Sequence, residues 1–180
     1  GDIPYTGKLA LDAYVQQGPG PRPSVVVIHG GSWTSGSRVA HVGQILELLT
    51  DAGHNWFAVD YRLGGLPRYE DSLTDLRQAL WFIRCRGREL RVDPDRLVLL
   101  GEDSGAHLAA LLAAERPAGV IGAVLIGGFY DLGAIPGLED VNAALLTRAS
   151  PSAAAIKLPV LVVHGSADAE TPLDRAQRYC

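Results

Sequence analysis

Short apolar runs alternate with segments of helical pattern along most of the chain. Five runs are long enough for strands buried on both faces: Val25–Ile28, Trp56–Val59, Leu97–Leu100, Val120–Ile126 and Val160–Val163. A half-exposed strand is expected over 8–15, where apolar and polar residues alternate. Strands that alternate with helices predict an α/β fold, with a mostly parallel sheet covered by helices on both faces.

Apolar residues recur with helical spacing in two stretches: Val42, Ile45, Leu46 and Leu49, then Leu73, Leu76, Leu80 and Ile83. The first helix should close near Gly53, and Asp71 or Ser72 can cap the second. The Ala-rich segment 129–158 predicts a small helical excursion over the sheet, and 171–179 predicts the start of another helix.

Composition fits one globular domain over residues 1–180. Hydrophobic residues make up 47% of the chain and charged residues 20%. A net charge of −4 gives no electrostatic case for nucleic acid. No apolar run reaches the roughly 18 residues of a membrane span, so we expect a soluble protein. The sequence leaves its compartment open, with the cytoplasm favoured. The two cysteines, Cys85 and Cys180, are too few for a disulfide framework or a zinc site, and we expect no metal and no cofactor.

Residues with catalytic potential follow the predicted strands directly. They are His29–Ser32, Asp60, Asp103, Tyr130, Asp131, His164 and Asp168. Because ligands of parallel sheets bind beyond the carboxyl ends of the strands, these side chains predict a single site at that edge.

The sharpest motif is GEDSG at Gly101–Gly105, which we call the elbow. It follows the run Leu97–Leu100 and opens a helix that begins near Ser104, the context that a G-x-S-x-G nucleophile elbow requires. The middle residue here is Asp103, and Ser104 comes one place later, where the backbone N–H is normally used.

Five motifs in this order resemble the α/β-hydrolase superfamily: HGGSW at 29–33, DYR at 60–62, GEDSGAHLAA at 101–110, GFYDL at 128–132 and LPVLVVHGSAD at 158–168. The esterase/lipase branch is most similar, including hormone-sensitive-lipase-like and bacterial feruloyl- or carbohydrate-esterase-like enzymes. The likeness covers nearly the whole chain.

The resemblance implies a carboxylic-ester hydrolase that takes a small-molecule ester or acyl ligand. Gly30, Gly31 and Ser32 would form the oxyanion loop, with the amide of Ser104 as a further donor. Asp168 matches the acid that orients the catalytic histidine. Trp33, Tyr130 and His107 are candidate substrate-binding residues, although His107 falls where a helix histidine of this branch has a structural role.

The chain departs from the family pattern in two ways. Asp103 stands in the nucleophile position, and the histidine that should follow the acid is missing before Cys180. We therefore expect an incomplete triad and a C-terminally truncated fold. The strand at Val160–Val163 would then be an exposed sheet edge, through which the protein could self-associate.

Asp103 has three interpretations, which the sequence leaves open. It can be a nucleophile, as in the haloalkane dehalogenases and epoxide hydrolases that share the fold. It can mark a serine esterase that has lost its serine and is impaired. It can also be a helix cap in a homologue that binds ligand without turnover. A reactive Ser104 is a further alternative.

Overall fold

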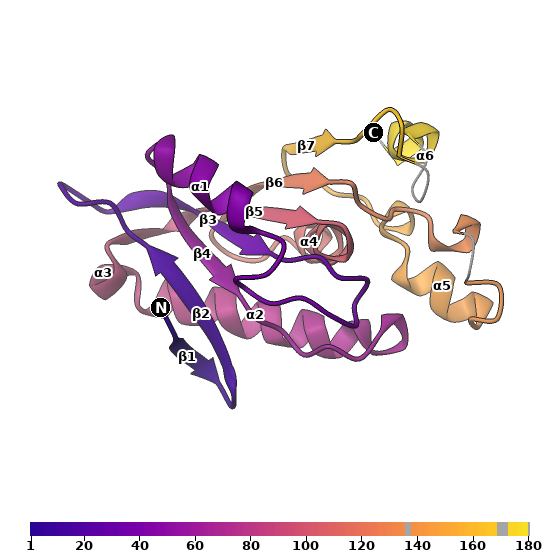
Figure 1. The fold of residues 1–180 in the computed structure, drawn as a ribbon, viewed down its shortest axis with the longest axis horizontal. Helices are drawn as coiled ribbons and strands as arrows, with labels where there is room; N and C mark the ends of the chain where they lie inside the picture. Colours follow the sequence, from indigo (N-terminus) through magenta and orange to yellow (C-terminus); the bar gives the residue numbers. More distant parts are fainter. Residues whose placement is uncertain (136–137, 169–172, 180) are drawn as a thin grey trace.

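A seven-stranded sheet forms the centre of the computed structural model, which describes residues 1–135, 138–168 and 173–179. Its strands are β1 (Ile3–Thr6), β2 (Leu9–Tyr14), β3 (Arg22–Ile28), β4 (Asn55–Val59), β5 (Val92–Glu102), β6 (Val120–Ile126) and β7 (Val160–Val163). Their order is β1-β2-β4-β3-β5-β6-β7 (Figure 1). The strands from β4 to β7 in this order are parallel, and β2 joins them antiparallel through β4.

Helices lie on both faces of this sheet (Figure 1). They are α1 (Gly43–Asp51), α2 (Tyr69–Cys85), α3 (Gly87–Leu90), α4 (Ser104–Ala114), α5 (Ala143–Ala149) and α6 (Leu173–Tyr179). Short 3-10 helices occur at Leu66–Arg68, Leu132–Ala134 and Pro151–Ala153. None of the helices in the described ranges has the length and apolarity that crossing a bilayer requires.

The side chains of Val25–Ile28 in β3 show why this part of the strand is continuously apolar. Val26 and Ile28 join the large core beneath α2 and α4, whereas Val27 belongs to a smaller cluster beneath α1. Successive side chains of a strand point to opposite faces, and here both faces are covered. The predicted α/β-hydrolase architecture, with a mostly parallel sheet between helices, is confirmed.

Boundaries account for most differences from the sequence predictions. The second long helix begins at Tyr69, and neither Asp71 nor Ser72 caps it, because both lie inside its first turn. Strand β5 extends back to Val92, where it pairs with Arg22 across a register shift. Strand β1 and helix α3 were not predicted.

The connection between β6 and β7 contains the 3-10 helices at 132–134 and 151–153 and helix α5, where the excursion was expected. The predicted C-terminal helix corresponds to α6, although the first two positions of that prediction, 171 and 172, lie outside the described residues.

Candidate active site

The elbow is a tight backbone turn between β5 and α4. Asp103 has φ 53° and ψ −123°, a conformation that is costly for a residue with a side chain. Two glycines make the turn possible. A Cβ on Gly101 would lie 2.3 Å from the carbonyl oxygen of Gly105, and a Cβ on Gly105 would lie 2.2 Å from the carbonyl oxygen of Ile28. The packing of β5, α4 and β3 therefore presents the Asp103 side chain at the carboxyl end of the sheet.

The carboxylate of Asp103 binds two backbone amides of the loop after β3. Its Oδ2 accepts hydrogen bonds from Gly31 N at 2.7 Å and from Ser32 N at 2.9 Å. We call these two N–H groups the amide cradle. Amides aimed at one point favour negative charge there. The structure thus brings the predicted oxyanion loop and the elbow together, with an oxygen of Asp103 in the amide cradle.

Asp103 occupies the N-cap position of α4 through its backbone alone. Its backbone oxygen accepts bonds from Ala106 N and His107 N, but its side chain makes no capping hydrogen bond. The side-chain cap that the third interpretation expected is therefore absent.

A tight turn holds the amide cradle in place. Gly31 has φ 120°, and its carbonyl oxygen accepts bonds from Thr34 N and Ser35 N at 3.0 Å each. A Cβ on Gly31 would lie 2.3 Å from the Ser35 carbonyl oxygen. Gly30 contributes space, because a Cβ there would lie 2.8 Å from the Cβ of Asp103. The glycine pair is therefore required for the loop to approach the elbow.

Ser104 lies in the interior behind Asp103. Its side chain is 0% exposed, and its hydroxyl donates to Asp103 Oδ2 at 3.3 Å. The Tyr61 hydroxyl, which donates to the His29 carbonyl oxygen at 2.7 Å, lies behind the same loop. The Ser104 hydroxyl is thus oriented toward the carboxylate.

The three candidate substrate-binding residues are also buried. Trp33 Nε1 donates to His107 Nδ1 at 3.1 Å, and His107 Nε2 contacts the Ala149 carbonyl oxygen at 2.7 Å. Burial lowers the pKa of His107 to about 4. Tyr130 is 2% exposed and stacks on Tyr179 at 4.3 Å. These side chains pack against one another and against neighbouring elements beneath the surface of the site.

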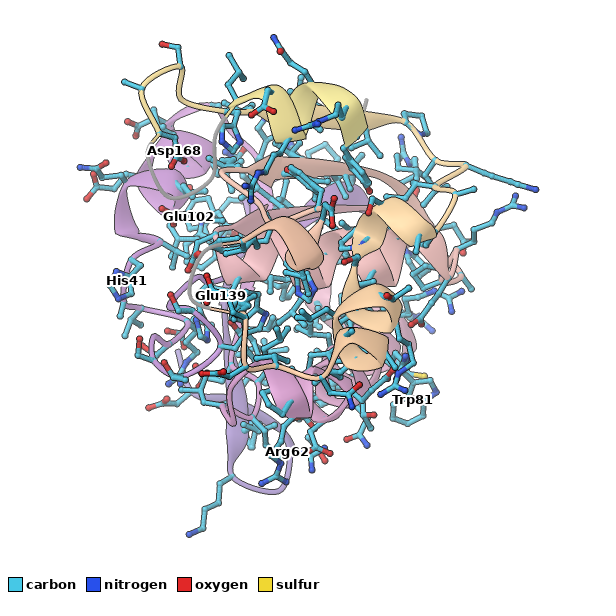
Figure 2. The ribbon with its side chains drawn as sticks, turned by 90° about the vertical axis from the view of Figure 1, so that its right-hand side faces the viewer. His41, Arg62, Trp81, Glu102, Glu139 and Asp168 are labelled. Carbon is cyan, nitrogen blue, oxygen red and sulfur yellow. The ribbon has the colours of Figure 1, made fainter. Side chains whose placement is uncertain are left out.

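Asp168 follows β7 and lies near the histidine at the end of that strand. His164 Nε2 is 3.5 Å from Asp168 Oδ2, and the His164 side chain is 3% exposed. Figure 2 looks at the carboxyl ends of the central strands and shows Asp168, Glu102 and His41 along one margin of the molecule.

Glu102 is a functional candidate that the sequence reasoning missed. Burial and the neighbouring charge of Asp103 raise the pKa of its carboxyl group. Its Oε2 is buried without a hydrogen-bond partner among the described residues. Its position at the end of β5, inside the elbow and directly before Asp103, was the signal that could have found it.

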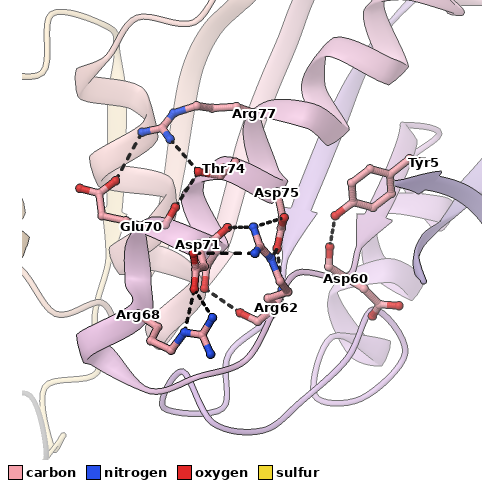
Figure 3. A network of polar contacts seen from close by, with 10 residues as sticks. Tyr5, Asp60, Arg62, Arg68, Glu70, Asp71, Thr74, Asp75 and Arg77 are labelled. Carbon is pink, nitrogen blue, oxygen red and sulfur yellow. Dashed lines mark hydrogen bonds and ion pairs between the residues drawn. The ribbon is translucent and has the colours of Figure 1, made fainter. Parts of the chain in front are cut away.

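The DYR motif has a supporting role. Arg62 binds the nearly buried Asp75 of α2 through Nε at 2.8 Å and Nη2 at 2.9 Å (Figure 3). Asp60 pairs with Arg38, whose backbone N also donates to Asp60 Oδ1 at 2.8 Å. Asp60 was expected among the site residues, but it anchors the loop that follows the amide cradle. In the described part of the chain, no group of three or more His, Cys, Asp or Glu side chains could hold a metal ion.

A family model described as BD-FAE matches residues 11–121. The chain belongs to the BD-FAE family. The match runs from β2 to the start of β6, so it includes the amide cradle and the elbow but ends before Asp168. The predicted membership of the esterase/lipase branch is confirmed.

Two proteins of Mycobacterium tuberculosis are similar to this chain in sequence. The probable carboxylic ester hydrolase LipM of Mycobacterium tuberculosis is 29% identical over 94 residues, 52% of this chain and 22% of LipM. Esterase LipC of the same organism is 26% identical over 191 residues, 88% of this chain and 47% of LipC. The chain thus spans less than half the length of either relative.

A solved structure extends the likeness to three dimensions. Esterase 2 of the planctomycete Thermogutta terrifontis, with butyrate bound, is 27% identical with a TM-score of 0.76. The alignment covers 95% of this chain and 72% of that one.

Proposed function

We propose that this chain is the core of a carboxylic-ester hydrolase whose turnover is impaired by Asp103. The observation that carries the proposal is the position of Asp103 Oδ2, which accepts hydrogen bonds from the amides of Gly31 and Ser32. In an ester hydrolase, such amides stabilise the oxyanion that forms from the substrate carbonyl. A resident carboxylate competes for the same donors.

The chemistry of a carboxylate gives a second reason for impairment. Attack of Asp103 on an ester carbonyl would form an anhydride, a less favourable route than the ester formed by a serine. Its charge would also repel the developing oxyanion. We therefore expect a residual acceleration of only about 10³–10⁴ over water, the amount that binding and an oxyanion hole supply without a working nucleophile.

The comparisons support an ester as the ligand class. LipM and LipC are named as ester hydrolases, and a solved structure of the Thermogutta esterase is titled as butyrate-bound. We extend this to the present chain as a preference for small esters of short acyl groups, with Asp168 as the predicted acid of an otherwise incomplete triad.

The test is hydrolysis of a short-chain aryl ester by the full-length gene product and its Asp103→Ser variant. We expect the serine form to gain at least about 100-fold in kcat/KM, because the nucleophile is restored and the amide cradle is freed. Asp103→Asn is the matched control, since it removes the charge without supplying a nucleophile. A serine form that is no faster than the asparagine form would refute the proposal.

One observation favours a second candidate function, an aspartate-nucleophile hydrolase. All hydrogen bonds that the structure describes for this carboxylate are made by Oδ2, which leaves Oδ1 without one. Oδ1 could attack a saturated carbon, so that an Asp103 ester forms and the leaving group departs with the electron pair of the broken bond. Water would then cleave the ester at its carbonyl carbon, whose oxygen would already lie in the amide cradle.

Incubation with a haloalkane or an epoxide, followed by mass spectrometry of the peptide that contains Asp103, separates these possibilities. A covalent adduct on Asp103 that is absent from Asp103→Asn supports the second function. Saturable binding of an ester or acyl ligand that remains unchanged, in both the natural and the serine form, would indicate a ligand-binding protein.

We also propose self-association through β7, which is the outermost strand on its side of the sheet in the described residues. Leu161 and Val163 of this strand are 59% and 44% exposed. An apolar strand with an open edge is a template for pairing with another chain.

A further inference from the structure

His107 lies on α4, one helical turn after Asp103, and both of its ring nitrogens contact other elements. The side chain is 0% exposed. Nδ1 is 3.1 Å from Trp33 Nε1, and Nε2 is 2.7 Å from the Ala149 carbonyl oxygen. Three segments that are distant in sequence therefore meet at one imidazole ring.

The two partners determine the protonation state of this ring. An indole N–H can only donate a hydrogen bond, and a carbonyl oxygen can only accept one. Nδ1 must therefore be the unprotonated acceptor and Nε2 must carry the proton. A protonated ring would turn a second N–H toward the Trp33 indole, and the other neutral tautomer would lose both contacts.

Trp33 connects His107 to the amide cradle. It directly follows Ser32, and both residues have positive φ, 49° for Ser32 and 63° for Trp33. Its ring lies edge-on to His107 with centroids 5.2 Å apart, and 5.1 Å from the ring of Phe129. The indole is thus the side-chain anchor of a loop whose backbone is otherwise in a costly conformation.

Ala149 connects His107 to the segment between β6 and β7. The next residue, Ser150, accepts a hydrogen bond from Leu132 N at 2.9 Å and donates to the Leu146 carbonyl oxygen at 2.8 Å. Leu146 and Ser150 line a crevice of about 320 Å³ that also includes Asp131. The His107 contact therefore joins the elbow helix to a wall of this crevice.

We infer that His107 is the positioning residue of the amide cradle: its neutral ring, protonated on Nε2, holds Trp33 and thereby fixes the Gly31 and Ser32 amides against the elbow. The contact with Ala149 places the 143–153 segment relative to the same point. The relevance of this arrangement to an ester ligand rests on the proposed function, but the arrangement itself is testable in the ligand-free protein.

The test compares two substitutions that each retain one of the two contacts. Asparagine places an acceptor near the position of Nδ1, whereas glutamine places a donor near the position of Nε2. We expect His107→Gln to accelerate hydrogen exchange of the Gly31 and Ser32 amides by about tenfold, the effect of losing one buried hydrogen bond. His107→Asn should change the exchange of these amides by less than about threefold.

Two further variants separate loss of the Trp33–His107 hydrogen bond from general destabilisation. Trp33→Phe removes the indole donor and leaves His107 in place. It should therefore accelerate exchange of the same two amides, and it provides the test if His107→Gln folds poorly. Leu112→Ala, a fully buried change on the same helix, is the control for general destabilisation and should leave the chemical shifts of the two amide protons unchanged. If the hydrogen-exchange rates of the Gly31 and Ser32 amides were unchanged in both His107→Gln and Trp33→Phe, the inference would be overturned. A ring nitrogen spectrum showing a proton on Nδ1 at neutral pH would also overturn it.

The exchange measurements are made without an ester, so their outcomes do not depend on catalysis. Unchanged exchange would refute the role of His107 without contradicting the proposed hydrolase function. An inactive Asp103→Ser variant would contradict the hydrolase function without affecting the role of His107.

Discussion

Asp103 and His107 are the residues whose chemistry depends most on their surroundings. Asp103 has an unusual backbone conformation and a carboxylate bound by two amides. His107 is an imidazole sealed between an indole and a carbonyl group. The sequence gives the identity of both side chains. It could not predict their hydrogen-bond partners, because those partners lie on other elements.

Acid should destabilise the protein through His107. Burial lowers the pKa of His107 from 6.5 to about 4, so the unfolded chain binds a proton at a higher pH than the native protein does. The stabilisation is complete above pH 6.5 and is lost as the pH falls toward 4, by about 3 kcal/mol in total. Urea unfolding between pH 7 and pH 4 measures the loss, which His107→Asn should reduce. Parallel pH profiles of the two proteins would contradict the prediction.

At the scale of elements, the site depends on the close approach of β3, β5 and α4. Gly105 lies against the backbone of β3, and Gly31 lies against its own turn. The sequence showed the glycines and the strand-turn-helix order. It could not show that a Cβ at Gly105 would collide with the carbonyl oxygens of Ile28 and His29, at 2.2 and 2.4 Å.

Gly105→Ala should therefore destabilise the protein by more than about 3 kcal/mol, because overpacking against backbone cannot be relieved by a rotamer change. Gly43→Ala is a matched control, since a Cβ on Gly43 would meet nothing within 4 Å and Gly43 is the first residue of α1. It should be neutral or stabilising by up to about 1 kcal/mol. Denaturant midpoints measure both, and similar values for the two variants would refute the argument.

At the scale of the whole molecule, the two edge strands of the described sheet, β1 and β7, have different surroundings. On one side, β1 is the outermost described strand, pairs with β2, and packs against α2 through Tyr5 and Phe82, whose ring centroids are 6.4 Å apart. On the other side, β7 has exposed apolar side chains. This contrast is the basis of the proposed self-association through β7.

The chain should associate as its concentration rises, and Leu161→Lys should shift it toward the monomer because a charge on an edge strand opposes pairing. Light scattering at micromolar to millimolar concentrations measures the change. Leu48→Lys provides the control, since Leu48 is 70% exposed on α1, and α1 packs on β4, which three strands separate from β7 in the sheet. A monodisperse monomer at every concentration would contradict the proposed self-association.

Much of the fold could be predicted because its signals are local. The runs at Val25–Ile28 and Val120–Ile126 are the strands that were predicted, because short apolar runs rich in β-branched residues favour strands in the interior of a sheet. The missed elements lack such a signal. The extension of β5 from Val92 passes through Asp93 and Pro94, which are atypical of strands, and is held by its pairing with β3.

The sequence by itself determined the alternation of strands and helices, the glycines of the elbow and the presence of a carboxylate where this family pattern places a serine. These follow from side-chain period and local backbone preference. Only the tertiary structure decided that Asp103 Oδ2 lies on the amides of Gly31 and Ser32, and that His107 joins Trp33 to Ala149. Contacts between segments some 40 to 75 residues apart depend on how the elements pack, and no local pattern encodes them.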